Sequence, residues 1–315
     1  MNIKTKYGTL IDYAREEYHT NGTLASCTLQ SKTIVKTAVG ELVPQYNYDD
    51  LRRKFIHSLT FYDSGDLKSV SLETVTEIET PLGKFPAEFI TFYPSGAIKR
   101  FFPLNGKLSG YWSETQEAEL AVPFSFEFSF ANFKAKIIGL HFYETGQLHS
   151  LTLQPEEVIT LKTPIGDIPV KTGFSLDAKG KLSSLEPVKP TPVKTPIGII
   201  RAFDSQSVGI HADSNSLIFS ETGDIVSIKT TDQIMITTKD TVDFIKPMEK
   251  MNPLNDDSTI IFPLTLKFTD TEFIITDTTD HHYSLSTSKV TIAPSTCTDK
   301  PSCTSSDCSS CGLCK

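Results

Sequence analysis

Hydrophobic residues in this chain occur in short runs, separated by polar turns that end in glycine. The clearest run is Phe124-Ser-Phe-Glu-Phe-Ser-Phe130, in which every second residue is aromatic. Such alternation is typical of a half-buried β-strand, because successive side chains of a strand point to opposite faces of the sheet. Apart from a modest stretch near Leu10 to Glu17, the sequence has no apolar stripe with the period of a helix. The pattern predicts an all-β chain.

One motif recurs along the chain: an aromatic residue, a short polar turn ending in glycine, then Leu-x-Ser and an aliphatic residue. Polar turns with glycine between strand-type residues predict β-hairpins, because glycine adopts the positive φ that a tight turn needs. Three full copies span Tyr18 to Leu29, Phe61 to Leu72 and Phe142 to Leu153, and weaker copies centre on Gly96, Gly180 and Gly223.

A second motif, Thr-(Pro/Ala)-aliphatic-Gly, follows the first at a steady distance. Its glycine lies 18 residues after the turn glycine in three copies (40 − 22, 83 − 65 and 198 − 180) and 20 residues in the fourth (166 − 146). Fixed periods of tens of residues are the signature of a repeat architecture. We therefore expect an elongated repeat sheet of serial antiparallel β-hairpins. The four copies are Thr37-Ala-Val-Gly40, Thr80-Pro-Leu-Gly83, Thr163-Pro-Ile-Gly166 and Thr195-Pro-Ile-Gly198.

Composition divides the chain into four parts. Residues 1–112 form a first β-repeat block, and residues 113–232 form a second block that opens with an acidic spacer. Residues 233–294 are degenerate β-repeats that cap the array, with a polar loop at 247–257, because a terminal repeat must present a polar outer face. Residues 295–315 are a cysteine-rich tail with almost nothing to bury, so we expect the tail to be disordered.

Charge and hydropathy restrict the partners. The net charge is −8 and the isoelectric point is near 5.4. Phosphate binding needs a clustered positive face, so we expect no nucleic-acid partner. The sequence contains no apolar run long enough to span a membrane and no hydrophobic signal core at its start, which predicts a cytoplasmic protein.

The cysteine tail is the constellation with the most chemical content. Two overlapping C-x-x-C steps can bring thiolates close enough to share a tetrahedral metal ion, and four sulfurs would complete a zinc shell. An iron–sulfur cluster, reversible disulfide chemistry and a tail without any ligand stay open as alternatives. The candidate metal ligands are Cys297, Cys303, Cys308, Cys311 and Cys314.

For the remaining cysteine and for the histidines, the sequence indicates ordinary structural roles. Cys27 occupies an aliphatic position of the repeat and is expected to be a small buried hydrophobe. The histidines His57, His141 and His149 vary between copies, so we expect structural or surface roles for them. Asp277 and Asp280-His281-His282 are candidates either for a metal site or for a polar surface loop, and we favour the loop. The sequence carries no recognised catalytic motif, and we expect no enzyme and no catalytic residues.

Three copies of the first motif carry a resemblance to a known family: Tyr62-Asp-Ser-Gly65-Asp-Leu67, Tyr93-Pro-Ser-Gly96-Ala-Ile98 and Tyr143-Glu-Thr-Gly146-Gln-Leu148. They resemble the MORN-repeat superfamily, and most of all the bacterial variant described as an antitoxin component of toxin–antitoxin modules. The resemblance implies serial β-hairpins in an elongated sheet that contacts proteins or membrane surfaces without catalysis. The chain departs from the family in its longer, two-part period.

These observations predict a non-enzymatic β-repeat scaffold that binds another protein, with a C-terminal cysteine cluster that binds zinc. The alternative is a metal- or redox-linked protein in which the tail carries the function and the repeats dock it.

Overall fold

The computed structural model describes residues 2–48, 52–53, 56–105, 113–207, 212–252 and 255–293. Strands make up 60% of the structure and helix 2%, so the predicted all-β fold of antiparallel hairpins is confirmed. No helix in these ranges is long and apolar enough to cross a membrane. The cysteine-rich tail lies outside the described residues.

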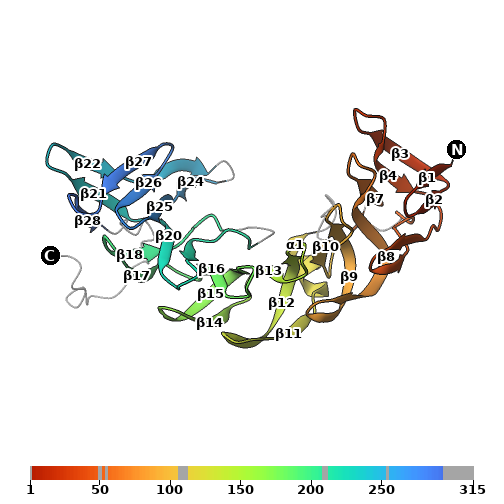
Figure 1. Cartoon of the computed structure of the whole chain (residues 1–315), viewed down its shortest axis with the longest axis horizontal. Helices are drawn as coiled ribbons and strands as arrows, with labels where there is room; N and C mark the ends of the chain where they lie inside the picture. The colour runs from red at the N-terminus through yellow and green to blue at the C-terminus, as the bar shows by residue number, and fades with distance from the viewer. Residues whose placement is uncertain are drawn as a thin grey trace.

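One antiparallel sheet runs the length of the molecule and bends into a crescent (Figure 1). Its first strand, β3, lies at one raised end and its last strand, β27, at the other, and each pairs with a single neighbour among the described residues. In order, the sheet contains β3 (Tyr13–Tyr18), β4 (Leu24–Leu29), β7 (Leu59–Phe61), β8 (Leu67–Thr80), β9 (Gly83–Phe92), β10 (Ile98–Phe102), β12 (Ala131–Phe142), β13 (Leu148–Leu153), β15 (Gly166–Leu176), β16 (Leu182–Pro187), β19 (Leu217–Phe219), β20 (Ile225–Thr230), β25 (Leu264–Phe268), β26 (Glu272–Thr276) and β27 (Asp280–Ser284).

Six glycine turns connect neighbouring strands of this sheet with one geometry. In the turn at Tyr62, its amide donates to Asp66 O at 2.8 Å, and the Gly65 amide donates back to Tyr62 O at 2.9 Å. The six turn glycines have φ between +78° and +94°, which side chains with a Cβ rarely adopt. The full and the weak copies of the first motif therefore form the same hairpin. The turns are those of Gly22, Gly65, Gly96, Gly146, Gly180 and Gly223.

The first residue of the glycine turn links one turn to the next. The Tyr62 hydroxyl donates to Phe92 O at 2.8 Å, and Phe92 directly precedes the tyrosine of the following turn. The same bond recurs at the neighbouring turns, and its series ends at Asp177, whose carboxylate instead accepts from amides of its own turn. The repeated tyrosine therefore holds the hairpins at a fixed spacing. The other members are His19 with Phe61 O, Tyr93 with Phe142 O, and Tyr143 with Leu176 O.

The second motif forms the tips of shorter hairpins. At each predicted copy the threonine hydroxyl donates to the carbonyl of the glycine three residues later, at 2.6 to 2.8 Å. Thr5-Lys-Tyr-Gly8 makes the same bond and is a further copy that the sequence pattern did not predict. The hairpins are formed by β1 (Ile3–Thr5) with β2 (Gly8–Leu10), β5 (Val35–Thr37) with β6 (Gly40–Leu42), β8 with β9, β14 (Ile159–Thr163) with β15, and β17 (Thr191–Thr195) with β18 (Gly198–Ala202).

The tips of these hairpins reach the glycine turns of the sheet. A Cβ atom added to Gly146 would lie 3.5 Å from Pro81, and one added to Gly223 would lie 3.0 Å from Pro164. At the N-terminal copy, Lys6 pairs with Asp66 at 2.6 Å instead. The two motifs therefore interlock, and a single hydrophobic core cluster extends from the first hairpins to β26.

The structure also reveals an internal duplication with an offset of 158 residues. Gly22, Gly40 and Gly65 correspond to Gly180, Gly198 and Gly223 (180 − 22 = 198 − 40 = 223 − 65 = 158). Each copy contains a segment between its short hairpin and its next glycine turn. We call residues 43–58, between β6 and β7, the first inserted segment, and residues 203–216, between β18 and β19, the second inserted segment.

The structure adds one helix to the predicted elements and corrects one loop. The acidic spacer contains α1 (Glu114–Leu120), which begins with a capping box between Ser113 and Gln116. The region 247–257, expected as a polar loop, forms the hairpin of β23 (Met248–Asn252) and β24 (Asn255–Phe262), because exposed strands need no alternating apolar pattern.

The remaining strands lie beside the long sheet or form a small sheet of their own. β11 (Pro123–Phe128) is the alternating phenylalanine run and pairs with β12, as predicted for a strand. Near the C-terminus, β21 (Gln233–Thr237) pairs with β22 (Val242–Ile245) and β28 (Lys289–Ala293). The buried Ile234 and Ile236 of β21 belong to the same core as Phe273 of β26.

Candidate functional site

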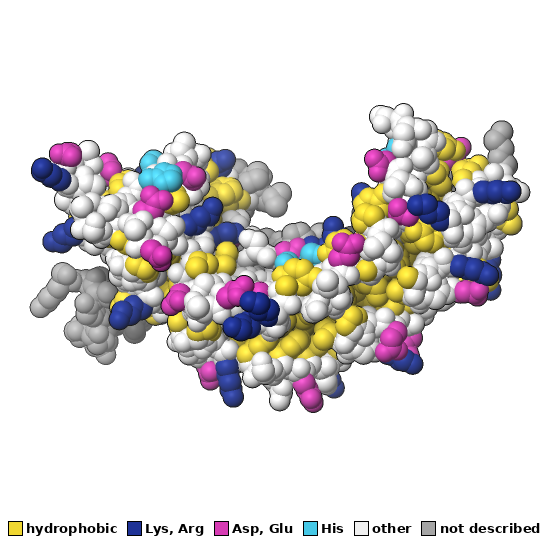
Figure 2. Space-filling view, in the orientation of Figure 1, with side chains coloured by type: hydrophobic (Ala, Val, Ile, Leu, Met, Phe, Trp, Pro, Cys, Tyr) yellow, Lys and Arg dark blue, Asp and Glu magenta, His cyan; other side chains and the backbone are white. Residues whose placement is uncertain are grey.

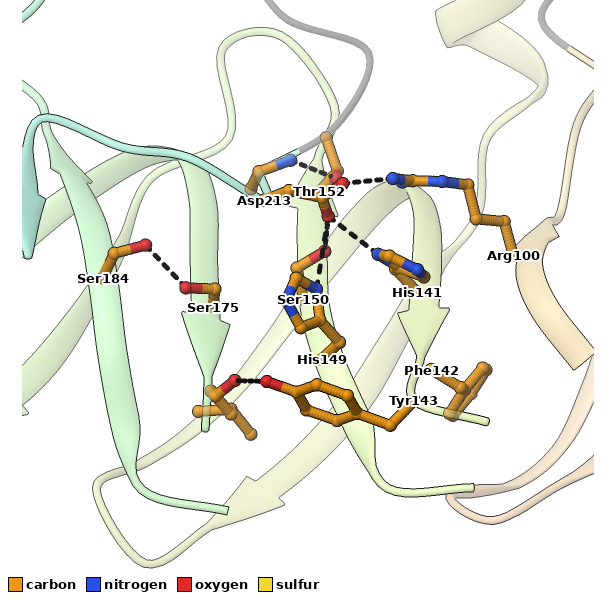
Figure 3. Close-up of polar contacts among 12 residues, drawn as sticks. Arg100, His141, Phe142, Tyr143, His149, Ser150, Thr152, Ser175, Ser184 and Asp213 are labelled. Atoms are coloured by element: carbon orange, nitrogen blue, oxygen red, sulfur yellow. Dashed lines mark hydrogen bonds and ion pairs between the residues drawn. The ribbon is translucent and has the colours of Figure 1, made fainter. Parts of the chain in front are cut away.

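A polar cluster lies where the second inserted segment meets the middle of the sheet (Figure 3). Arg100 comes from β10, His141 from β12, and His149 and Ser150 from β13, and all of them approach Asp213. In the space-filling view, histidine and acidic side chains come together in the hollow of the crescent (Figure 2).

The cluster departs from the side chains that the repeat uses elsewhere. At the equivalent paired positions, Thr60 and Ser69 share a hydrogen bond of 2.6 Å, and so do Ser175 and Ser184. In the third such pair, His141 stands opposite Ser150. Arg100 takes the serine position of the preceding copy, opposite Thr91. Imidazole and guanidinium groups thus replace small hydroxyls in one part of the sheet.

A β-bulge brings His149 into the cluster. The register pairs His141 with Ser150 and Phe142 with Leu148, so His149 is the extra residue of the bulge. A bulge re-aims side chains that would otherwise alternate between faces. The ring centroids of His149 and His141 are 4.6 Å apart, and so are those of His149 and Tyr143.

Asp213 is the centre of the cluster. Its Oδ2 accepts a short hydrogen bond from Arg100. Its Oδ1 accepts from Ser150 Oγ at 2.5 Å and lies 3.0 Å from His141 Nδ1. Burial alone would raise the pKa of Asp213, but its contacts with the histidines, Ser150 and Arg100 lower that pKa far below the usual range. The carboxylate is therefore anionic at every physiological pH.

The two histidines differ in the hydrogen bonds that their ring nitrogens make. Burial lowers the pKa of His141, against a smaller raising effect from Asp213, which favours a neutral ring. His149 Nδ1 is buried and makes no hydrogen bond, although Asp213 Oδ1 is 3.5 Å away. The side chains of His141, His149 and Asp213 are 12%, 23% and 22% exposed, so the cluster is enclosed but reachable from solvent. One nitrogen atom in it, His149 Nδ1, lacks a hydrogen-bond partner.

This cluster was not predicted from the sequence. His141 and His149 were expected in structural or surface roles, and Asp213 was not singled out. The ligand-type atoms of His141, His149 and Asp213 all lie within 4.8 Å of one another. The described part of the chain contains no other group of three His, Cys, Asp or Glu side chains that meets this criterion.

The residues that the sequence did single out are placed differently. The five tail cysteines, predicted as zinc ligands, lie outside the described residues, so zinc binding there stays a prediction. Cys27 is fully buried, and burial raises the pKa of its thiol to about 12, which confirms the expected role as a small core residue. Asp280, His281 and His282 lie in strand β27 instead of the expected loop.

A groove of about 760 Å³ lies beside β27. Its lining includes Val242 and Phe244 of β22 and His281 and Tyr283 of β27. Tyr283 donates to Asp243 Oδ2 at 3.0 Å, which connects the two strands. Burial and the nearby Asp243 raise the pKa of Tyr283 to about 12, so the donor is protonated at physiological pH.

A second buried charge cluster holds the first inserted segment. Arg52 donates to Glu88 at 2.7 and 3.0 Å and to Glu117 of α1 at 2.5 and 2.6 Å. The exposed fractions of the three side chains are 14%, 8% and 10%. Two carboxylates enclose one guanidinium, with bidentate contact to each, which is the geometry of a structural clamp.

The chain matches no protein-family model, no curated protein and no solved structure. Its function therefore has to be inferred from the geometry of its own residues.

Proposed function

We propose that this protein is a non-enzymatic β-repeat scaffold that binds another protein through the groove between β22 and β27. The observation that carries the proposal is the exposure of large apolar side chains at this groove. Val242 is 65% exposed, and Phe244 is 59% exposed. Adjacent exposed apolar side chains at a concave surface are typical of a protein-binding site.

Strand edges at the groove support an extended partner. Among the described residues, β22 pairs only with β21, and β27 pairs only with β26. An unpaired edge offers backbone donors and acceptors to which an incoming strand can add, while pockets select its alternate side chains. The expected partner segment is extended and carries aliphatic or aromatic residues that cover Val242 and Phe244.

The test is a comparison of two double variants in the full chain. Partners recovered by affinity purification from the source cells are identified, and the affinity of each purified partner is then measured by calorimetry. Val242→Asp with Phe244→Asp should weaken the relevant partner at least about 30-fold, the equivalent of one hot-spot residue. The matched control, Val158→Asp with Ile165→Asp, changes two apolar residues of similar exposure at another hairpin and should leave the affinity unchanged.

Both variants should keep the parent's unfolding temperature, because all four side chains are exposed. Partners that bind the groove variant as tightly as the parent would overturn the proposal, and so would partners lost equally from both variants.

A further inference from the structure

We propose that His141, His149 and Asp213 bind a divalent transition-metal ion, with zinc as the first candidate. This site would be separate from the cysteine tail and independent of the groove between β22 and β27. It would fasten the second inserted segment to the sheet through a metal ion.

The spacing of the ligand atoms fits a metal ion. His141 Nδ1 lies 3.0 Å from Asp213 Oδ1, and His149 Nδ1 lies 3.5 Å from the same oxygen atom. Ligands about 2.0–2.1 Å from a tetrahedral zinc ion are roughly 3.3 Å from one another. Two imidazoles and a carboxylate are a donor set that zinc accepts. The two histidine–aspartate distances therefore lie within a few tenths of an ångström of this value, and all three ligand atoms lie within 4.8 Å of one another.

The unpartnered nitrogen of His149 is a second, independent observation. A buried polar atom without a partner is costly, and the exceptions call for an explanation such as an ion. His149 Nδ1 faces an anionic oxygen, and Tyr143 packs edge-on against its ring. Coordination would give this nitrogen the partner that it lacks.

His141 lies between Asp213 and Tyr93. Its Nδ1 is 3.0 Å from Asp213 Oδ1, and its Nε2 is 3.5 Å from the hydroxyl oxygen of Tyr93, which donates its own hydrogen to Phe142 O. A metal ion at Nδ1 would take the place of the hydrogen that Nδ1 donates to Asp213, and Nε2 would then carry the N–H group and donate it to Tyr93.

Neighbouring side chains orient the ligands without occupying the metal position. Arg100 binds Oδ2 of Asp213, and Oδ1 is the oxygen atom that both histidines approach. Tyr93 supplies a partner for the outer nitrogen of His141, as is usual around metal-bound histidine. Ser150 can keep its hydrogen bond to Asp213 or turn toward the ion. Three protein ligands leave a position for water, as in zinc sites that keep an open position.

The experiment must separate this site from the cysteine tail, so its parent is the full chain with the tail thiols removed. After dialysis against excess zinc and then buffer, metal content is measured by mass spectrometry, and affinity by competition with a chromophoric chelator. We expect one zinc ion per chain. The five changes in this parent are Cys297→Ser, Cys303→Ser, Cys308→Ser, Cys311→Ser and Cys314→Ser.

Single substitutions in that parent assign the ligands. His149→Gln should weaken zinc binding by more than about 100-fold, because loss of an outer-shell partner alone costs 10- to 100-fold. The matched control, His282→Gln, changes a histidine that is 56% exposed and should leave the affinity unchanged. A parent without bound zinc, or a His149→Gln variant with the parent's affinity, would overturn the proposal.

A spectroscopic readout keeps the test valid if a variant fails to fold. X-ray absorption at the zinc edge of the parent, with all three ligands intact, should show two imidazoles and only nitrogen or oxygen atoms in the first shell. A first shell without imidazole would contradict the assignment.

Discussion

The two inserted segments occupy equivalent places in the duplicated halves, yet opposite charges hold them. The first segment sends a guanidinium, Arg52, between two carboxylates, which its bidentate contacts satisfy. The second sends a carboxylate, Asp213, toward a guanidinium and two imidazoles, one of which has a nitrogen without a partner. One architecture thus supports a closed clamp in one half and a histidine–aspartate cluster with an unsatisfied nitrogen in the other.

The largest expected effect is on the clamp of the first segment. Arg52→Ala leaves Glu88 and Glu117 buried without their cation, and breaking a buried ion pair costs about 3–5 kcal/mol. Denaturant unfolding should show a loss of this size. The control is Lys36→Ala, which removes an exposed ion pair with Glu41 and should cost less than about 1 kcal/mol. Equal losses for the two variants would refute the clamp.

A smaller loss of stability is expected when the buried charge of the second segment is removed. Asp213→Asn removes the charge that faces Arg100 but keeps a carbonyl oxygen as acceptor, so the cost should be about 1–3 kcal/mol in metal-free protein. The measurement is again denaturant unfolding, with a chelator present. A larger loss of stability for Asp213→Asn than for Arg52→Ala would contradict the proposed difference between the two halves.

Glu186 gives the second segment a pH dependence through a carboxylate that the first half does not have at the equivalent position. The carboxylate accepts from the amides of Asp204 and Ser216, at 3.0 and 2.9 Å, and the equivalent residue of the first half is Thr28 (186 − 28 = 158). Burial raises the pKa of Glu186 above its unfolded value, although these hydrogen bonds oppose the shift. The folded state therefore holds this proton more tightly, and stability from this group falls as pH rises through the folded pKa.

Glu186→Gln removes that titration and places an amide donor against backbone donors. The variant should be about 1–3 kcal/mol less stable at low pH, and the difference should shrink as pH rises. Unfolding curves at several pH values measure the difference. A difference that grows with pH would mean that folding lowers the pKa of Glu186 instead of raising it.

The smallest expected loss of stability comes from the tyrosine bonds between successive turns. Tyr62→Phe and Tyr143→Phe each remove one hydroxyl bond between successive turns, and each should cost about 0.5–1.5 kcal/mol. The two losses should agree, because the bonds are equivalent. A markedly larger loss at Tyr143, measured by denaturant unfolding, would mean that it has a further role beside His149.

Local signals in the sequence predicted the hairpins well. A turn glycine and the threonine of the second motif act within a few residues, so their bonds could be inferred without the fold. The start of α1 was also readable, since Ser113 and Gln116 have capping-box spacing, but the acidic composition suggested a spacer. Strand β23 and the start of β24 were missed because exposed hairpins do not need the alternation that burial imposes.

The cluster around Asp213 could not be assembled from local pattern. It depends on a bulge that turns His149 toward His141, and on a segment that returns to β13 from far along the chain. The sequence did contain one usable signal. Arg100 and His141 stand where the copies at Gly65 and Gly180 carry hydroxyl side chains, and both replacements fall in neighbouring copies.

Amide hydrogen exchange with and without zinc tests the difference between the two halves most directly. The measurement uses the full chain with the five tail cysteines changed to serine, and it follows peptides from residues 203–216 and 43–58 in the same sample. Zinc should slow exchange in the second inserted segment and leave the first unchanged. Equal protection of both segments, or no protection of the second, would contradict a metal site confined to the second half.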